Sequence, residues 1–166
     1  MIETLEPSIR QIMNPLTEAL PLEQAMAKLV QPDRAGAEVI AIVERIVEEP
    51  FVAERPALIA GLWLYVDDLE RSHGVSQSID DATGSFWHGI MHRREGDFSN
   101  SHYWFGKTGL HAAMSQIECP CIEGGYDGHQ FVDLVEAEHL ARQASEGLVA
   151  CQRHEWSTLL NSCARP

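Results

Sequence analysis

Residues 85–105 concentrate side chains that can bind metal ions, transfer protons or hold anions. This stretch contains three His, two Arg, two Trp and three acid or amide side chains. Core packing alone does not require so many polar groups beside aromatic ones. A functional site is therefore expected in this segment.

His88 and His92 are the main candidates for metal ligands. Each residue of a helix advances about 100° around the axis, so these two rings and the Glu95 carboxylate fall within one narrow arc. Two imidazoles at positions i and i+4 can bind one divalent metal ion, such as Zn or Fe, and a third ligand leaves one position open. The candidates for this third ligand are Asp68, His73, Glu95 and His102.

His88 and His92 also fit two alternatives without a metal. With eight His in 166 residues, a pair at this spacing arises by chance on the order of 0.4 times. In the first alternative, the two rings hydrogen-bond across a helical hairpin, with Asp97 or Asn100 as partners. In the second, His92 or His102 acts as an acid or base while an Asp orients the ring.

Two Glu-x-x-His pairs suggest a further version of the metal hypothesis. Glu70 with His73 and Glu136 with His139 match the motif of di-iron carboxylate bundles, where such pairs and two further Glu converge inside four helices. The helices expected around His88 are too short for such a bundle. A di-iron centre is therefore a minor variant.

Arg93 and Arg94 also have two possible roles. Arg94 falls inside the apolar arc of its helix, where an unpaired guanidinium costs free energy. An ion pair with Asp67 or Asp68 would satisfy it and would join two helices. Alternatively, Arg93 or Arg94 binds the carboxylate or phosphate of a small anionic molecule.

The elements that position these residues are expected to be helices. Apolar residues recur at steps of three and four along most of the chain, as on the buried face of a helix. The predicted helices cover residues 21–30, 33–49, 56–73, 85–95, 98–105, 108–118, 129–145 and 146–163. The sequence thus predicts an all-α fold, a compact single-domain bundle of about seven or eight helices over residues 1–166.

Composition limits the partners and the location. The net charge of −13 and the pI near 4.9 disfavour nucleic acid and membrane surfaces, which bind clustered Lys and Arg. The longest apolar run, 57–66, is about half of the roughly twenty residues that a membrane span needs. The amino terminus lacks the pattern of a secretory signal. Cys119, Cys121, Cys151 and Cys163 form neither a Cys-x-x-Cys pair nor a dense disulfide pattern, so a cytoplasmic protein is expected.

Residues 87–105 resemble a signature segment of uncharacterised bacterial and fungal helical proteins, with the pattern W-H-x-I-x-H-R-R-E-G-D-x-x-N-x-x-Y-W-F. Weaker similarity lies around 126–133. This resemblance implies a helical fold and no particular activity. The stretch from Gly89 to Phe105 also resembles the middle of a tetratricopeptide-type helical hairpin. Only one such unit is visible, whereas stacked repeats need about three, so a peptide-binding solenoid is not expected.

These features predict a small-molecule-binding protein, with enzymatic activity as the favoured use of the site. Its pocket would lie between the helix of Trp63 and the hairpin 85–105. If a divalent metal is present, a bound water becomes the nucleophile or base. The predicted catalytic residues are His92, His102, Arg93, Arg94 and Asp68, and the predicted metal ligands are His88, His92, Glu95 and His73. The remaining alternative is a non-enzymatic structural or partner-binding helical module.

Overall fold

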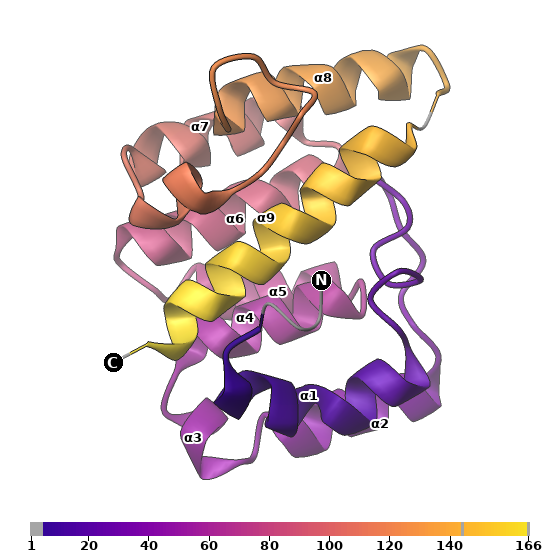
Figure 1. Ribbon diagram of the computed structural model, residues 1–166, viewed down its shortest axis with the longest axis vertical. Helices are drawn as coiled ribbons and strands as arrows, with labels where there is room; N and C mark the ends of the chain where they lie inside the picture. The colour runs from indigo at the N-terminus through magenta and orange to yellow at the C-terminus, as the bar shows by residue number, and fades with distance from the viewer. Residues whose placement is uncertain (1–4, 144, 166) are drawn as a thin grey trace.

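The computed structural model describes residues 5–143 and 145–165, which form helices joined by loops (Figure 1). In chain order the elements are α1 (Pro7–Ala19), α2 (Ala37–Ile46), α3 (Pro50–Ala53), α4 (Pro56–Tyr65), α5 (Leu69–Ser76), α6 (Ala82–Glu95), α7 (Phe98–Thr108), the 3₁₀ helix η2 (Ala112–Gln116), α8 (Gly128–Leu140) and α9 (Glu146–Ala164). Across these described residues there are nine α-helices and no strand. The predicted all-α bundle is confirmed. None of the described helices combines the length and apolar character needed to cross a bilayer.

α6 and α7 form the hairpin that the short linker between them predicts. Gly96 ends α6 in the left-handed conformation, with φ at 90°, and Asp97 caps the start of α7. A Cβ atom on Gly89 would lie 3.1 Å from the ring of Phe105, so this glycine lets the two helices approach closely. Ser101 then fixes the contact by donating a 2.7 Å hydrogen bond to the Gly89 carbonyl.

α4 and α6 lie in the middle of the molecule, between α7 and α8 at one end and α1, α2 and α3 at the other (Figure 1). α5 and α7 pack against α6, α4 packs against α5, α6 and α9, and α8 lies on α7. α9 runs diagonally across α4, while α1 pairs with α2 at one end of the molecule. Every residue of α6 from Gly84 to Arg94 is buried as a result. Polar side chains on this helix must therefore find partners inside the protein.

Two groups of buried apolar side chains form the core. The larger group spans α1, α2, α4, α6 and α9 and includes Leu58, Trp87 and Trp156. The smaller group lies mainly between α8 and α9 and includes Phe131 and Val135. The segment that carries the candidate site is thus part of the packed interior.

The predicted helix over 56–73 is wrong, because the chain breaks between α4 and α5. Asp67 adopts a left-handed conformation with φ at 59°, and its carboxylate lies 2.6 Å from the Arg94 guanidinium. Asp68 becomes the cap of α5 and accepts the Arg71 N–H at 3.2 Å. A continuous helix would carry Asp67 away from Arg94, so a tertiary ion pair accompanies the break.

The predicted helix over 21–30 is also wrong, since these residues form turns. Their backbone carbonyls are used by side chains from elsewhere in the fold. The Lys28 carbonyl accepts hydrogen bonds from Arg94 and Gln152, and the Met26 carbonyl accepts another from Gln152. A helix over 21–30 would use the Met26 carbonyl for its own hydrogen bond to the N–H of Val30.

Three further elements differ from the prediction. The short helix α3 begins at Pro50, where the sequence predicted only the end of a helix. α1 was not predicted, and Pro15 inside it obscures the signal of its buried Met13 and Leu16. In place of a helix over 108–118, α7 continues to Thr108 and the short η2 follows after a turn at Gly109. The remaining predicted helices are present, with ends shifted by a few residues.

Cys119 and Cys151 form a disulfide that ties the loop before α8 to α9, with 4.9 Å between their Cα atoms. Their spacing of 32 residues did not predict the pair, because only the fold brings them together. Cys121 and Cys163 are free. Structural disulfides are rare in a reducing cytoplasm. Cysteine usage therefore no longer supports a cytoplasmic location, which stays a prediction.

Candidate metal centre

Three histidines meet where α5 packs against α6. One ring nitrogen from each of His73, His88 and His92 lies within 4.8 Å of the other two. The rings of His88 and His92 stack one helical turn apart, with 4.8 Å between their centroids. The His73 ring stands edge-on to both, at 4.7 Å from His88 and 5.3 Å from His92. Of the four candidates for a third ligand, His73 is the one that joins this group.

The packing of α4, α5 and α6 positions these rings. Ser72, next to His73, is fully buried and donates a 3.0 Å hydrogen bond to the Ala60 carbonyl of α4. The start of α6 is fixed by Asp81, whose carboxylate accepts the Gly84 N–H at 2.9 Å. Ser72 is thus anchored directly beside His73, and Gly84 is anchored about one turn before His88.

The cluster is closed on one side and accessible on the other. The exposed fractions of His88 and His92 are 3% and 6%, whereas His73 is half-buried. His88 also stacks on Trp104 of α7, with 3.8 Å between centroids and 10° between planes. Solvent or a small molecule would thus approach along the His73 edge.

Burial keeps the rings of His88 and His92 uncharged. Burial, together with the neighbouring His92 and His73 rings and Lys107, lowers the pKa of His88 to about 4. Burial also lowers the pKa of His92, although the Glu95 carboxylate acts in the opposite direction. Both rings are therefore neutral in neutral solution and carry the lone pairs that a metal ion needs.

The two nitrogens of His92 have different neighbours. Nδ1 lies 3.0 Å from Glu95 Oε2, and Nε2 lies 3.1 Å from the Asn100 amide nitrogen. Glu95, predicted as a ligand, thus lies behind His92 instead of among the three ring nitrogens. Asn100 is the partner that the metal-free hydrogen-bond alternative predicted. Asp97, the other predicted partner, caps α7.

His88 differs from His92 in its hydrogen bonding. Within the described residues, its Nδ1 atom is buried without a hydrogen-bond partner. Buried polar atoms almost always have a partner, so such an atom requires an explanation. A bound ion or water would supply one.

Arg93 lies outside the His cluster, in an ion pair with Glu155. Its side chain is fully buried, and its two terminal nitrogens donate to the Glu155 carboxylate at 2.8 and 2.5 Å. Its guanidinium carbon also lies 4.2 Å from the centre of the Phe131 ring. The Tyr126 hydroxyl donates to the same carboxylate. An anionic ligand would have to displace a buried carboxylate to reach Arg93.

Arg94 is likewise held inside the protein. It pairs with Asp67 at 2.6 Å and donates hydrogen bonds to the carbonyls of Leu64 and Lys28. One of the two predicted internal partners, Asp67, is thus in contact, while the other is not. The geometry favours the ion-pair interpretation of Arg94 over ligand binding.

Asp68 and His102 also lie away from the His cluster. Asp68 caps α5, and its carboxylate lies 3.4 Å from Arg34 and 3.5 Å from Arg71. His102 contacts Asp133 of α8 at the surface. The structure therefore does not gather the five predicted catalytic residues into one site.

The sequence pattern did not predict Glu155 and Tyr126, the polar side chains that surround the Arg93 ion pair. A signal for Glu155 existed, because it lies on the buried face of α9 together with Leu148, Gln152 and Leu159. A carboxylate in such a stripe requires a cation. No comparable signal marks Tyr126, which lies in a loop.

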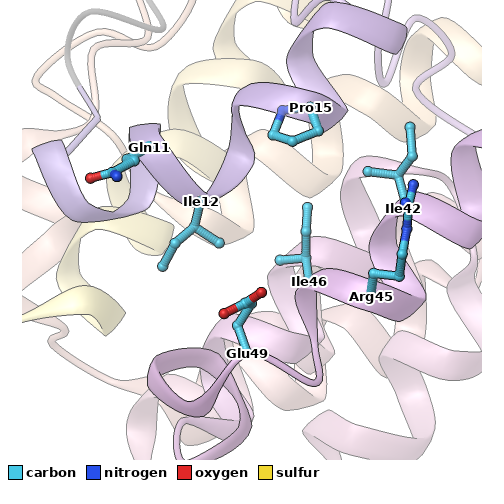
Figure 2. Close-up of a pocket in the computed structure, with 7 residues that line it drawn as sticks. All are labelled: Gln11, Ile12, Pro15, Ile42, Arg45, Ile46 and Glu49. Atoms are coloured by element: carbon cyan, nitrogen blue, oxygen red, sulfur yellow. The ribbon is translucent and has the colours of Figure 1, made fainter.

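An apolar groove between α1 and α2 is separate from the His cluster. It has a volume of about 430 Å³ and is lined by Gln11, Ile12, Pro15, Ile42, Arg45, Ile46 and Glu49. Figure 2 shows the apolar members between the two helices, with Arg45 and Glu49 on the α2 side. None of the predicted site residues lines it.

Comparison with known proteins does not assign this chain to a family. A search of protein-family models found no match, and neither curated proteins nor solved structures gave one. The resemblance of residues 87–105 to helical proteins therefore stays a prediction. The case for a site rests on the arrangement of its side chains.

Proposed function

We propose that this chain binds one divalent transition-metal ion through His73, His88 and His92, and that the metal serves a reaction on a small molecule. The observation that carries the proposal is the convergence of three ring nitrogens within 4.8 Å of one another. Two of them belong to rings that burial keeps neutral. Within the described residues, the buried His88 Nδ1 atom also has no hydrogen-bond partner, so no protein group competes for it.

The donor set favours zinc or ferrous iron. Neutral imidazoles suit both ions, and three protein ligands leave a fourth position for water or substrate. A zinc ion with such ligands lowers the pKa of its bound water to about 7. Hydrolysis or hydration of a small molecule is the reaction class that this chemistry favours.

Glu95 and Asn100 would control how His92 binds the metal. The Glu95 carboxylate accepts the Nδ1 proton of His92, which leaves Nε2 as the nitrogen for the metal. In the structure the Asn100 amide occupies that nitrogen at 3.1 Å. Metal binding would therefore require the Asn100 side chain to turn away.

The surroundings suit a site that takes a small ligand from one side. Trp104 covers His88, and Lys107 Nζ in turn lies 4.5 Å from the centre of a Trp104 ring. The half-buried His73 forms the accessible edge. Access from one side limits the size of any substrate and keeps bulk water partly excluded.

A second candidate function is purely structural. The hydrogen bonds of His92 to Glu95 and Asn100 join α6 to α7 without any metal. In that case the three rings would serve as packing between helices. This alternative accounts for His92 but leaves the His88 Nδ1 atom without a partner.

Metal titration of untagged, chelator-treated protein separates the two functions. Wild type should bind one equivalent of Zn²⁺ or Co²⁺, and bound metal should raise the melting temperature because it prefers the folded state. His73→Gln, His88→Gln and His92→Gln should each abolish this binding. His139→Gln, which alters an exposed ring on α8, is the matched control and should bind like wild type. Unchanged binding in the three variants, or none in wild type, would leave the structural function.

Trp104 offers a local readout of the same event. Cu²⁺ or Co²⁺ bound at His88 would lie beside the stacked indole and should quench its fluorescence. Trp104→Phe should remove that quenching while leaving metal stoichiometry unchanged. Equal quenching in wild type and in Trp104→Phe would place the ion elsewhere.

A further inference from the structure

A second group of titratable side chains lies where α7 meets α8. His102 Nδ1 is 2.9 Å from His129 Nδ1, and the two rings stack with 8° between their planes. The other nitrogen of His102, Nε2, is 3.1 Å from Asp133 Oδ1. One hydrogen bond joins the two rings, one ion-pair contact joins His102 to Asp133, and none of the three side chains belongs to the metal centre.

The hydrogen bond between the rings and the nearby carboxylate indicate where the ring protons lie. The Asp133 carboxylate, 3.1 Å from His102 Nε2, favours the proton of this ring on Nε2. In a neutral ring, His102 Nδ1 then carries a lone pair, and His129 donates to it from its own Nδ1. The Nε2 atom of His129 is left with a lone pair and can take a proton from another molecule. The Asp133 carboxylate would stabilise the positive charge that results.

His129 also lines an open groove of about 600 Å³ between the end of α7, η2 and the loop before α8. The apolar residues of this groove are Phe105, Leu110, Met114, Ile117 and Tyr126. Five glycines contribute bare backbone, Ser115 and Asp127 are polar members beside His129, and no Lys or Arg is among the lining residues that could bind an anion. The groove therefore favours a small uncharged molecule with an apolar part.

The first turn of α8 lies in the same groove. Gly128 and His129 begin this helix, and the first N–H groups of a helix have no acceptor within it. Asp127 takes the N–H of Gln130 at 2.8 Å, which leaves the N–H groups of Gly128 and His129 for other acceptors. Backbone N–H groups in such a place can stabilise the negative oxygen that forms during acyl transfer.

We propose that His129 is the general base of a hydrolytic site for small uncharged acyl esters, with His102 and Asp133 as positioning residues. His129 Nε2 takes a proton from a water molecule, and the hydroxide oxygen adds to the ester carbonyl carbon. The resulting tetrahedral anion expels the alcohol oxygen, which takes the proton back from His129. The products are a carboxylic acid and an alcohol, and both histidine rings return to their neutral form.

This site is independent of the metal centre, so it is assayed in the presence of chelator. The probe is p-nitrophenyl acetate. His129→Gln should lower kcat/KM for this ester by about 100-fold, the lower range for loss of a general base. His139→Gln, on the same helix and outside this groove, is the matched control and should retain the wild-type rate. A wild type that hydrolyses the ester no faster than His129→Gln would overturn the proposal.

The positioning roles have a separate readout. His102→Gln and Asp133→Asn should lower kcat with KM unchanged, because neither side chain lines the groove. Nitrogen-15 spectra of the imidazoles should show the His129 proton on Nδ1 in wild type. Asp133→Asn should shift the proton distribution of His102 without unfolding the protein. A His129 proton on Nε2 in wild type would contradict the proposed relay, whatever the rates.

Discussion

Arg94 and Asp67 form a buried ion pair at the junction of α4 and α5, with 2.6 Å between the guanidinium and the carboxylate. The Arg94 side chain has no exposed surface, and that of Asp67 is 15% exposed. Asp67 meets Arg94 from a left-handed backbone conformation that few residues other than Gly, Asn and Asp adopt readily. The left-handed turn between α4 and α5 therefore places the Asp67 carboxylate against the Arg94 guanidinium of α6.

Arg94→Met should destabilise the protein by about 3–5 kcal/mol, because it leaves the Asp67 carboxylate buried without its cation. Combining it with Asp67→Asn should restore much of this loss, since Asn tolerates the left-handed conformation and carries no charge. Combining it with Asp68→Asn is the control and should restore little. Urea unfolding of the three variants measures the effect. Equal recovery in both double variants would show that Asp67 is not the decisive partner.

Glu95 and Asn100 should affect metal binding in opposite directions. Glu95→Gln removes the carboxylate that orients His92 and should weaken Zn²⁺ binding by about 10–100-fold. Asn100→Ala frees His92 Nε2 from its amide partner and should strengthen binding. Competition with a chromogenic chelator measures both affinities. If Asn100→Ala weakens binding, the amide supports the metal site instead of competing with the ion.

The all-α fold and the pairing of His88 with His92 could be predicted from the sequence, because both depend on the spacing of nearby residues. Steps of three and four residues indicate helices, and positions i and i+4 place His88 and His92 on one side of α6. The apolar surroundings of Arg94 predicted an acidic partner, which is Asp67. His73 was one of several equal candidates, since only packing of α5 on α6 distinguishes it.

The remaining features depend on contacts between distant residues. The turns over 21–30 use their carbonyls to bind Arg94 and Gln152, which no local pattern reveals. The role of His129 was not predicted, because its hydrogen-bond partner His102 is 27 residues away in the sequence. The Arg93 partner Glu155 is 62 residues away, on a helix whose position only the complete fold determines.

Reduction of the Cys119–Cys151 disulfide should lower stability without abolishing the fold. A bridge across such a loop typically contributes about 2–4 kcal/mol, mainly by restricting the unfolded chain. Melting with and without a phosphine reductant measures the loss, and thiol titration of the unfolded protein should rise from two to four groups on reduction. Cys121→Ser is the control and should respond to the reductant like wild type. A wild type with four titratable thiols before reduction would contradict the disulfide.

The stability of the protein should fall in mild acid, partly through His111. Its Nδ1 accepts the Ala113 N–H at 3.1 Å, and Nε2 lies 3.2 Å from the Thr83 hydroxyl. Protonation of Nδ1 would break the first of these bonds. Burial lowers the pKa of His111 below its usual value of 6.5, although the Asp81 carboxylate opposes the shift.

Because the folded-state pKa is the lower one, the unfolded chain binds the proton first as the pH falls. The contribution of neutral His111 is therefore complete above about pH 6.5 and decreases as the pH drops through that value. His111→Asn keeps a side chain able to cap η2 but does not titrate. The free energies of unfolding of wild type and of this variant are measured by urea at pH 7.5, 6.5 and 5.5 with chelator present. As the pH falls, wild type should lose more stability than the variant. A constant difference across this range would mean that His111 does not gain its proton on unfolding.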